Sequence, residues 1–329
     1  KRLIDSEDER IKVFIEETEE ISKTFQHPRK SFILDVDKTE DVGSLMVVVY
    51  AKGRVSPLVE ANGEGEVVNI LDVPFSEGLF MVSNKGKVYW IAGSQALHGS
   101  KVSFKESDER IIGAFVRHLA SDRIILATKA GYVKKIPLAD FEYKAQGMSI
   151  IKFSVEGDEV VRILQSPEDG DLIIFTYGGR ALRFPISQTP PATAGSKGVM
   201  GIKLERGDWV NGIRAVKDFS YLLVITDDGS IKKVSVDEIS ARGRGTKGVD
   251  MLGSSKGNLV DLIPIEEIVE IMVATQMGKV FYDRIDQKEM PLSRREHKAK
   301  KRWTLENDKV VRVVITRYEA VSKTPVHPS

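Results

Sequence analysis

The sequence contains no cysteine among its 329 residues. A disulfide framework, a thiolate metal site and a cysteine nucleophile are therefore excluded, and the composition suits a reducing cytoplasm. The sequence also has no run of about 18 apolar residues, so no transmembrane helix is expected. Neither an initiator methionine nor a signal-peptide pattern is found at Lys1, which indicates a piece cut from a longer protein.

Motifs that carry catalysis are missing as well. The five histidines have no metal-ligand spacing, and no phosphate-binding loop of the form G-x-x-x-x-G-K-[ST] occurs. Residues 243–248 match G-x-G-x-x-G, but a dinucleotide site needs a helix directly after this motif. The glycine-broken sequence that follows has no helical stripe. We therefore expect no catalytic residue, no metal and no cofactor in this chain.

The first 41 residues predict an acidic amphipathic helix. Apolar residues such as Ile11, Phe14 and Ile21 recur at close to seven-residue intervals between glutamates, and Pro28 ends the pattern. This stretch holds 8 basic and 12 acidic residues, whereas the whole chain has a net charge of +1. The remainder of the chain is therefore basic.

From residue 44 onward, the sequence predicts a series of β-hairpins. Short runs of Val, Ile, Leu, Phe and Thr are interrupted by tight turns that contain glycine. Six of these hairpins resemble one another, with an interval near 48 residues after a shorter first one. Their glycines are Gly53, Gly86, Gly131, Gly179, Gly229 and Gly278. A repeat of this length with several short strands predicts a propeller-like array of β blades, and six units suit a closed ring.

A second feature repeats in step with the hairpins. Asp108, Asp158, Asp208 and Asp308 each precede a strand rich in Val and Ile, and Asn258 stands where the missing member is expected. We interpret these residues as turn formers, because an active site rarely needs so many copies of one acid.

Basic residues recur at equivalent places near the outer ends of the hairpins and in the loops after them. In a ring, such places follow one rim, and a continuous cationic track binds DNA through its phosphates. The alternative is that paired surface lysines only increase solubility. The candidate DNA-binding residues are Lys87, Lys134, Lys135, Arg180, Arg183, Lys197, Lys232, Lys233, Arg242, Arg244, Lys247, Arg294, Arg295, Lys298, Lys300, Lys301 and Arg302.

Several segments resemble the C-terminal domain of the A subunits of bacterial type IIA topoisomerases, which are DNA gyrase and topoisomerase IV. The resemblance rests on the hairpin 128–135 followed by 143–146, and on 198–204 followed by 207–208. Residues 25–31, after the charged helix, look like the end of the coiled-coil region of the DNA-cleaving core in that family. The resemblance covers nearly all of residues 44–318.

The resemblance implies a mainly β fold, a six-bladed β-pinwheel over 42–318, preceded by a helical connector over 1–41 and followed by a flexible tail over 319–329. It also implies a non-catalytic, cytoplasmic and nucleoid-associated domain that bends or wraps duplex DNA. The expected partners are DNA, the N-terminal cleavage core of the same polypeptide and the ATPase B subunit of an A2B2 enzyme. The catalytic tyrosine and the sites for ATP and Mg²⁺ are expected elsewhere in that enzyme, and no membrane partner is expected.

One motif of the gyrase family departs from its usual place. Gyrase A subunits carry a Q-R-R-G-G-K-G box in the first blade, on which chiral wrapping depends. The first hairpin here is followed by no such box, and the nearest likeness follows the fifth hairpin at Arg244, Gly245, Lys247 and Gly248. A topoisomerase IV-like domain that bends DNA without chiral wrapping therefore stands beside the gyrase interpretation. A protein-interaction propeller and a propeller enzyme are the remaining alternatives.

Overall fold

The fold is described from a computed structural model that covers residues 44–58, 65–116, 123–141, 145–167 and 169–319. The chain divides into a unit over Lys1–Gly43 and a unit over Ser44–Ser329, and the description concerns the second. The helix expected over 1–41 and the tail after Glu319 lie outside the described residues. Within these ranges, no helix is both long and apolar enough to cross a membrane.

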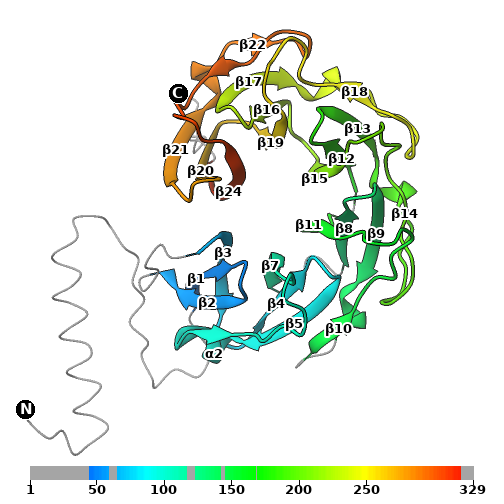
Figure 1. The fold of residues 1–329 in the computed structure, drawn as a ribbon, viewed down its shortest axis with the longest axis vertical. Helices are drawn as coiled ribbons and strands as arrows, with labels where there is room; N and C mark the ends of the chain where they lie inside the picture. The colour runs from blue at the N-terminus through cyan, green and yellow to red at the C-terminus, as the bar shows by residue number, and fades with distance from the viewer. Residues whose placement is uncertain (1–43, 59–64, 117–122, 142–144, 168, 320–329) are drawn as a thin grey trace, which may run out of the picture. The chain divides into compact units, whose positions relative to one another are not determined.

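Six small sheets, here called blades 1 to 6, follow one another along the second unit (Figure 1), and they are antiparallel except where β22 pairs with β17. Each is built around one of the hairpins expected from the sequence. These hairpins are β1 (Ser44–Tyr50) with β2 (Arg54–Pro57), β4 (Gly78–Ser83) with β5 (Lys87–Ala92), β8 (Arg123–Thr128) with β9 (Tyr132–Pro137), β12 (Asp171–Thr176) with β13 (Arg180–Pro185), β16 (Tyr221–Thr226) with β17 (Ser230–Ser235), and β20 (Ile268–Thr275) with β21 (Val280–Asp286). The mainly β, six-bladed fold is thus confirmed.

A third strand pairs with the first strand of each hairpin and lies toward the centre of the arc of blades (Figure 1). These inner strands are β3 (Val67–Pro74), β7 (Ile111–Val116), β11 (Val160–Gln165), β15 (Val210–Val216), β19 (Leu259–Ile265) and β24 (Val310–Glu319).

The fourth strand of a blade comes from the next repeat along the chain. After forming the hairpin of one blade, the chain runs outward and adds a short strand to the hairpin of the preceding blade. It then returns and forms the inner strand of the blade that it left. The outer strands are β6 (Ser100–Lys101), β10 (Gln146–Ser149), β14 (Val199–Met200), β18 (Val249–Asp250), β22 (Leu292–Ser293) and β23 (Lys300–Lys301), which complete blades 1 to 5. A single turn of helix follows each of the hairpins in blades 2 to 6: α2 (Gly93–Leu97), η2 (Leu138–Asp140), η3 (Ile186–Gln188), η4 (Val236–Glu238) and η5 (Gln287–Glu289).

The glycine of each hairpin turn has a conformational and a packing role. Gly53 and Gly131 have φ of +78° and +95°, a region that side chains with a Cβ rarely adopt. A Cβ on Gly53 would also lie 2.6 Å from Val102 Cγ2, in the segment that the next repeat supplies. The turn therefore needs glycine both for its shape and for the passage of the exchanged segment.

The hydrophobic core is divided into clusters that lie between neighbouring blades. Alternate residues of one strand face opposite neighbours: Val47 and Val49 pack against blade 2, while Val48 and Tyr50 pack against Met272 of blade 6. Similar clusters join blades 2 and 3, 3 and 4, 4 and 5, and 5 and 6. Blade 6 therefore packs on blade 1, and the six blades close on themselves, as their number suggested.

Candidate nucleic-acid interface

The segments that carry the exchanged strands form the outer edge of blades 1 to 5, and we call them the rim segments. They comprise residues 100–104, 146–153, 193–204, 242–252 and 292–303. In Figure 1 the strands β10, β14, β18 and β22 lie on the outside of the arc. Backbone hydrogen bonds join successive segments, from Lys152 N to Ser196 O (3.0 Å) and from Lys203 N to Thr246 O (2.9 Å). The rim is therefore continuous over several blades.

The charge of the rim segments is strongly one-sided. They hold 13 basic residues against two acidic ones, Asp250 and Glu296. Nine of the basic side chains are exposed and have no ion pair within the described residues. These nine are Lys101, Lys152, Lys197, Lys203, Arg242, Lys247, Arg294, Lys298 and Lys300. Six of them are among the residues predicted from the sequence, and their role in phosphate binding stays a prediction.

Sequence reasoning missed Lys101, Lys152 and Lys203. Lys152 and Lys203 each stand between an inward-facing apolar pair, so that the exposed lysine alternates with buried side chains as in a half-buried strand. In the second case the pair is Ile202 and Leu204. This alternation is the signal in the sequence that identifies both lysines as exposed.

The gyrase-box-like residues shape the rim at blade 4. The Arg244 guanidinium donates to Gln188 O (2.9 Å) and Met200 O (3.0 Å), which ties its segment to the neighbouring one. Gly245 and Gly248 have positive φ of 77° and 71°, and a Cβ on Gly248 would collide with the Ala181 carbonyl. Arg244 thus holds the loop, whereas Lys247 projects from it as an exposed cation.

Four of the predicted DNA-binding lysines are not on the surface at all, and that part of the prediction is wrong. Lys134, Lys135, Lys232 and Lys233 are between 1% and 7% exposed. Their ammonium groups donate to backbone carbonyls of loops that are distant in sequence. Lys134 Nζ, for example, lies 2.7 Å from Ile150 O and 2.9 Å from Ser196 O.

Two of these lysines hold rim segments from beneath: Lys134 joins two neighbouring segments, and Lys232 Nζ donates to Arg295 O (2.6 Å) and His297 O (2.5 Å) of one segment in blade 5. Lys135 and Lys233 donate instead to carbonyls of the short helices η3 and η5. Burial lowers the pKa of Lys134 to about 8, and it lowers the pKa of Lys232 and Lys233 as well. The charge remains because carbonyl oxygens replace the lost water.

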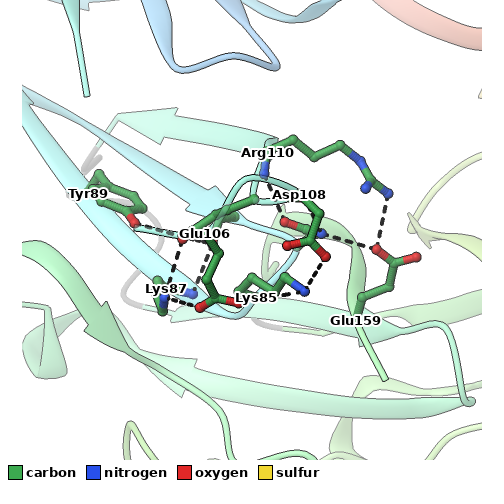
Figure 2. A network of polar contacts seen from close by, with 10 residues as sticks. Lys85, Lys87, Tyr89, Glu106, Asp108, Arg110 and Glu159 are labelled. Carbon is green, nitrogen blue, oxygen red and sulfur yellow. Dashed lines mark hydrogen bonds and ion pairs between the residues drawn. The ribbon is translucent and has the colours of Figure 1, made fainter. Parts of the chain in front are cut away.

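The cations predicted in the hairpins of blades 2 and 4 are paired with carboxylates of their own repeats. Lys87 Nζ lies 2.7 Å from Glu106 Oε1 and 3.3 Å from Glu109 Oε2, in the network that Figure 2 shows. Arg180 pairs with Glu205 and Arg183 with Asp171, at 3.0 and 2.6 Å. These three residues are therefore paired cations, and their role in DNA binding stays a prediction.

The basic cluster of blade 5 divides into two groups. Arg302 makes a two-pronged contact with Asp283 at 2.8 Å, Lys301 lies 3.6 Å from Asp228, and Arg295 pairs with Glu296 at 3.1 Å. Since carboxylates neutralise these three, the remaining group of Arg294, Lys298 and Lys300 provides the free positive charge of this segment.

The repeated aspartates are turn residues, as the sequence indicated. Asp158 Oδ1 accepts from Ala130 N (2.8 Å), Asp208 Oδ1 from Gly178 N (2.8 Å) and Asp308 Oδ1 from Met277 N (3.0 Å). Each therefore fastens the tip of a hairpin. Among the residues that the structure describes, no group of histidine and acidic side chains could hold a metal ion.

Comparison with known proteins agrees with this architecture. A family model described as the DNA gyrase C-terminal domain, a β-propeller, matches residues 79–96, 122–167, 170–217 and 220–260. The DNA gyrase A subunit of Mycobacterium leprae is 33% identical over 161 residues, which cover 48% of this chain and 13% of the relative. The Streptomyces coelicolor protein of the same name is 31% identical over 245 residues, or 68% of this chain and 28% of the relative.

Two solved structures share the fold. A DNA gyrase A C-terminal domain aligns with a TM-score of 0.68 at 24% identity, covering 83% of this chain and 99% of its own. The C-terminal domain of a DNA topoisomerase IV aligns with a TM-score of 0.68 at 20% identity, covering 84% and 94%. The chain therefore shares the fold of these two C-terminal domains. With the family model and the gyrase relatives, it follows that the chain belongs to the C-terminal domains of type IIA topoisomerase A subunits.

The chain corresponds to a minor part of its relatives. It spans 13% of the Mycobacterium leprae protein and 37% of the DNA gyrase A subunit from Aminobacterium colombiense, to which it is 26% identical.

The division between exposed and buried lysines leads to a direct test. We expect Lys197→Ala with Lys247→Ala to weaken duplex DNA binding by about tenfold at 100 mM salt and to reduce the salt slope by about 2, because two phosphate contacts are lost. The control is Lys217→Ala with Lys279→Ala, which removes the same charge outside the rim segments. Fluorescence anisotropy with a labelled duplex measures both, and equal weakening in the two variants would contradict a localised track.

The buried lysine of blade 3 leads to a second test. The pKa of Lys134 is about 8 in the fold and near 10.5 when unfolded, so the unfolded chain binds more protons between these values. Stability relative to Lys134→Met should therefore rise with pH across this window, by about 3 kcal/mol. Denaturant unfolding of both proteins at pH 7 and pH 10 measures the change. Lys105→Met, at an exposed site, serves as the control, and parallel pH profiles for wild type and Lys134→Met would refute the assignment.

Proposed function

We propose that this domain binds duplex DNA along the rim segments and bends it around the blades, as a non-catalytic part of a type IIA topoisomerase. The observation that carries the proposal is the continuous edge with 13 basic and two acidic residues, nine of whose cations have no carboxylate partner among the described residues. Such an edge neutralises phosphates without reading bases, so binding should be insensitive to sequence.

Bending needs contacts that are distributed over the whole rim. A smooth bend of 40–90° over 20–30 base pairs costs about 1–6 kcal/mol, which one pair of lysines cannot supply. The free cations occur in every rim segment from blade 1 to blade 5, so DNA that follows the edge gains contacts as it curves. The curvature of the edge then determines the curvature of the DNA.

The other parts of the proposal come from the relatives. The DNA gyrase A subunits that the chain matches are much longer, so the cleavage core with its tyrosine and an ATPase B subunit would be supplied outside this chain. Within the domain we propose no cofactor. Because the substrate is DNA, we infer that the parent enzyme acts at the nucleoid, in the cytoplasm.

A second candidate is bending without chiral wrapping, and one observation favours it. Nine residues, 58–66, separate β2 from β3, and among the described residues no outer strand from blade 1 pairs with blade 6. In the part of the chain that the structure describes, the rim segments therefore end at blade 5, before the place where the gyrase box would be expected to contribute. A track that ends there fits a topoisomerase IV-like role.

The salt dependence of binding tests the proposal itself. If six to nine of the free cations contact phosphates, the slope of log K against log salt should be about −5 to −8. Anisotropy titrations between 50 and 200 mM salt with two unrelated duplex sequences provide the measurement. A slope near zero, or a strong preference for one duplex, would overturn backbone binding along the rim.

Ligation of a nicked circular plasmid separates wrapping from bending. In the presence of saturating protein, chiral wrapping changes the linking number after ligation, whereas bending alone does not. Two-dimensional gels of the ligated topoisomers show which occurs. A positive shift identifies gyrase-type wrapping, and unchanged topoisomers with retained binding identify the second candidate.

A further inference from the structure

Blade 6 is the one blade, among those the structure describes, whose hairpin lacks an exchanged outer strand. In blades 1 to 5, the second hairpin strand pairs with residues from the next repeat, as Val133 does with Val199 and Ala181 with Val249. The corresponding strand β21 has β20 as its only partner within the described ranges. Val280, the residue equivalent to Val133, is 45% exposed, whereas Val133 and Ala181 are fully buried.

The hairpin glycine shows the same difference. The carbonyl of each of the first five hairpin glycines accepts a hydrogen bond from a rim segment, for example Gly131 O from Gly201 N (2.8 Å) and Gly53 O from Val102 N (3.0 Å). No described residue donates to Gly278 O. A Cβ on Gly278 would meet nothing within 4 Å, although it would contact rim segments at the other five glycines.

The chain itself cannot fill this edge in the way it fills the others. The excursion to the preceding blade and back takes 18 residues (93–110) in blade 2 and 24 residues (186–209) in blade 4. Blade 1 has nine residues for the same path, and an extended chain of nine spans at most about 30 Å in one direction. A round trip is therefore out of reach.

The five filled edges define the chemistry of a suitable occupant. Two rim segments share the pattern [ST]-K-G-V-x-x-[IL]: residues 196–202 and 246–252. In the first, Gly198 and Gly201 lie so close to Val133 that a Cβ on either would approach within 3 Å, and the Val199 backbone pairs with Val133. The last aliphatic residue, Ile202 or Leu252, covers the hairpin glycine.

We propose that the free edge of β21 binds an extended segment of a partner polypeptide with the pattern [ST]-K-G-V-x-x-[IL], by strand addition. The segment would pair with Val280, donate to Gly278 O and place its aliphatic residue over Gly278. Tyr282, which is 67% exposed, extends the contact along the strand. Exposed strand edges are common sites of peptide addition, and here five occupied copies of the site show the mode of binding.

The test uses the whole 329-residue chain and a fluorescent peptide with the sequence of residues 193–204. We expect saturable binding in anisotropy titrations. Val280→Pro should weaken it by about tenfold or more, because proline removes the outward N–H of an edge strand and leaves the pairing with β20 intact. Met277→Ala, at the tip of the same hairpin, should leave the affinity within about twofold.

A change in the peptide gives a second test that does not alter the protein. Replacing the residue equivalent to Gly198 by leucine should abolish binding, since its side chain would collide with the Val280 backbone as it would with Val133. No saturation below about 1 mM peptide, or equal binding to wild type and a folded Val280→Pro variant, would overturn the proposal. Self-association in sedimentation that Val280→Pro abolishes would also overturn it, in favour of a second copy as occupant.

Discussion

The exchange of outer strands between successive blades is the constraint on which the rest of the structure depends. A blade made only of its own residues has three strands and an open outer edge, and the next repeat closes it with a ladder of as few as two residues, such as β14 on β9. Because the closing segment must travel out and back, each repeat needs a long connection, and this connection becomes the rim. The stability of each blade is therefore coupled to its successor, beyond the apolar packing between their faces.

The exchange of outer strands also determines which lysines are buried under the rim and which are exposed on it. A rim segment brings unpaired backbone carbonyls with it, and in blades 3 and 5 a buried lysine from the hairpin beneath satisfies two of them. Lys134 and Lys232 are thus used to hold the rim, and the lysines on the rim segments other than Lys301 have no carboxylate partner within the described residues. In blade 2 the position of Lys134 is taken by Tyr89, which donates to the buried Glu109, so the same place is satisfied by a different side chain. The free charge depends on the exchanged segment and not on the hairpin.

Much of the fold could be predicted from the sequence, because turn glycines, alternating strands and a 48-residue repeat are local signals. The aspartates were assigned correctly for the same reason, because each recurs in step with the hairpins, at the same place before a strand. The role of Lys134 could not be found in this way. Its partners, Ile150 and Ser196, are 16 and 62 residues away in the sequence. In addition, two adjacent lysines in a sequence are typical of an exposed, solvated surface. Only the path of the exchanged segment shows that Lys134 and Lys135 are both buried beneath other parts of the chain.

The short first repeat explains two features that are distant in sequence, the missing box after the first hairpin and the open edge of β21. Within the described residues no exchanged strand joins blades 6 and 1, and their junction consists of the packing of Val48 and Tyr50 against Met272 and Val314 and the ion pair between Arg312 and Glu66 at 3.0 Å. The other five junctions have a strand ladder in addition to such packing. A protein opens locally where the fewest cooperative contacts must be broken, so we expect the ring to open between blades 6 and 1 before it opens at any other junction. An opening there would leave the rim from blade 1 to blade 5 intact, and DNA could follow it without the ring having to stay closed.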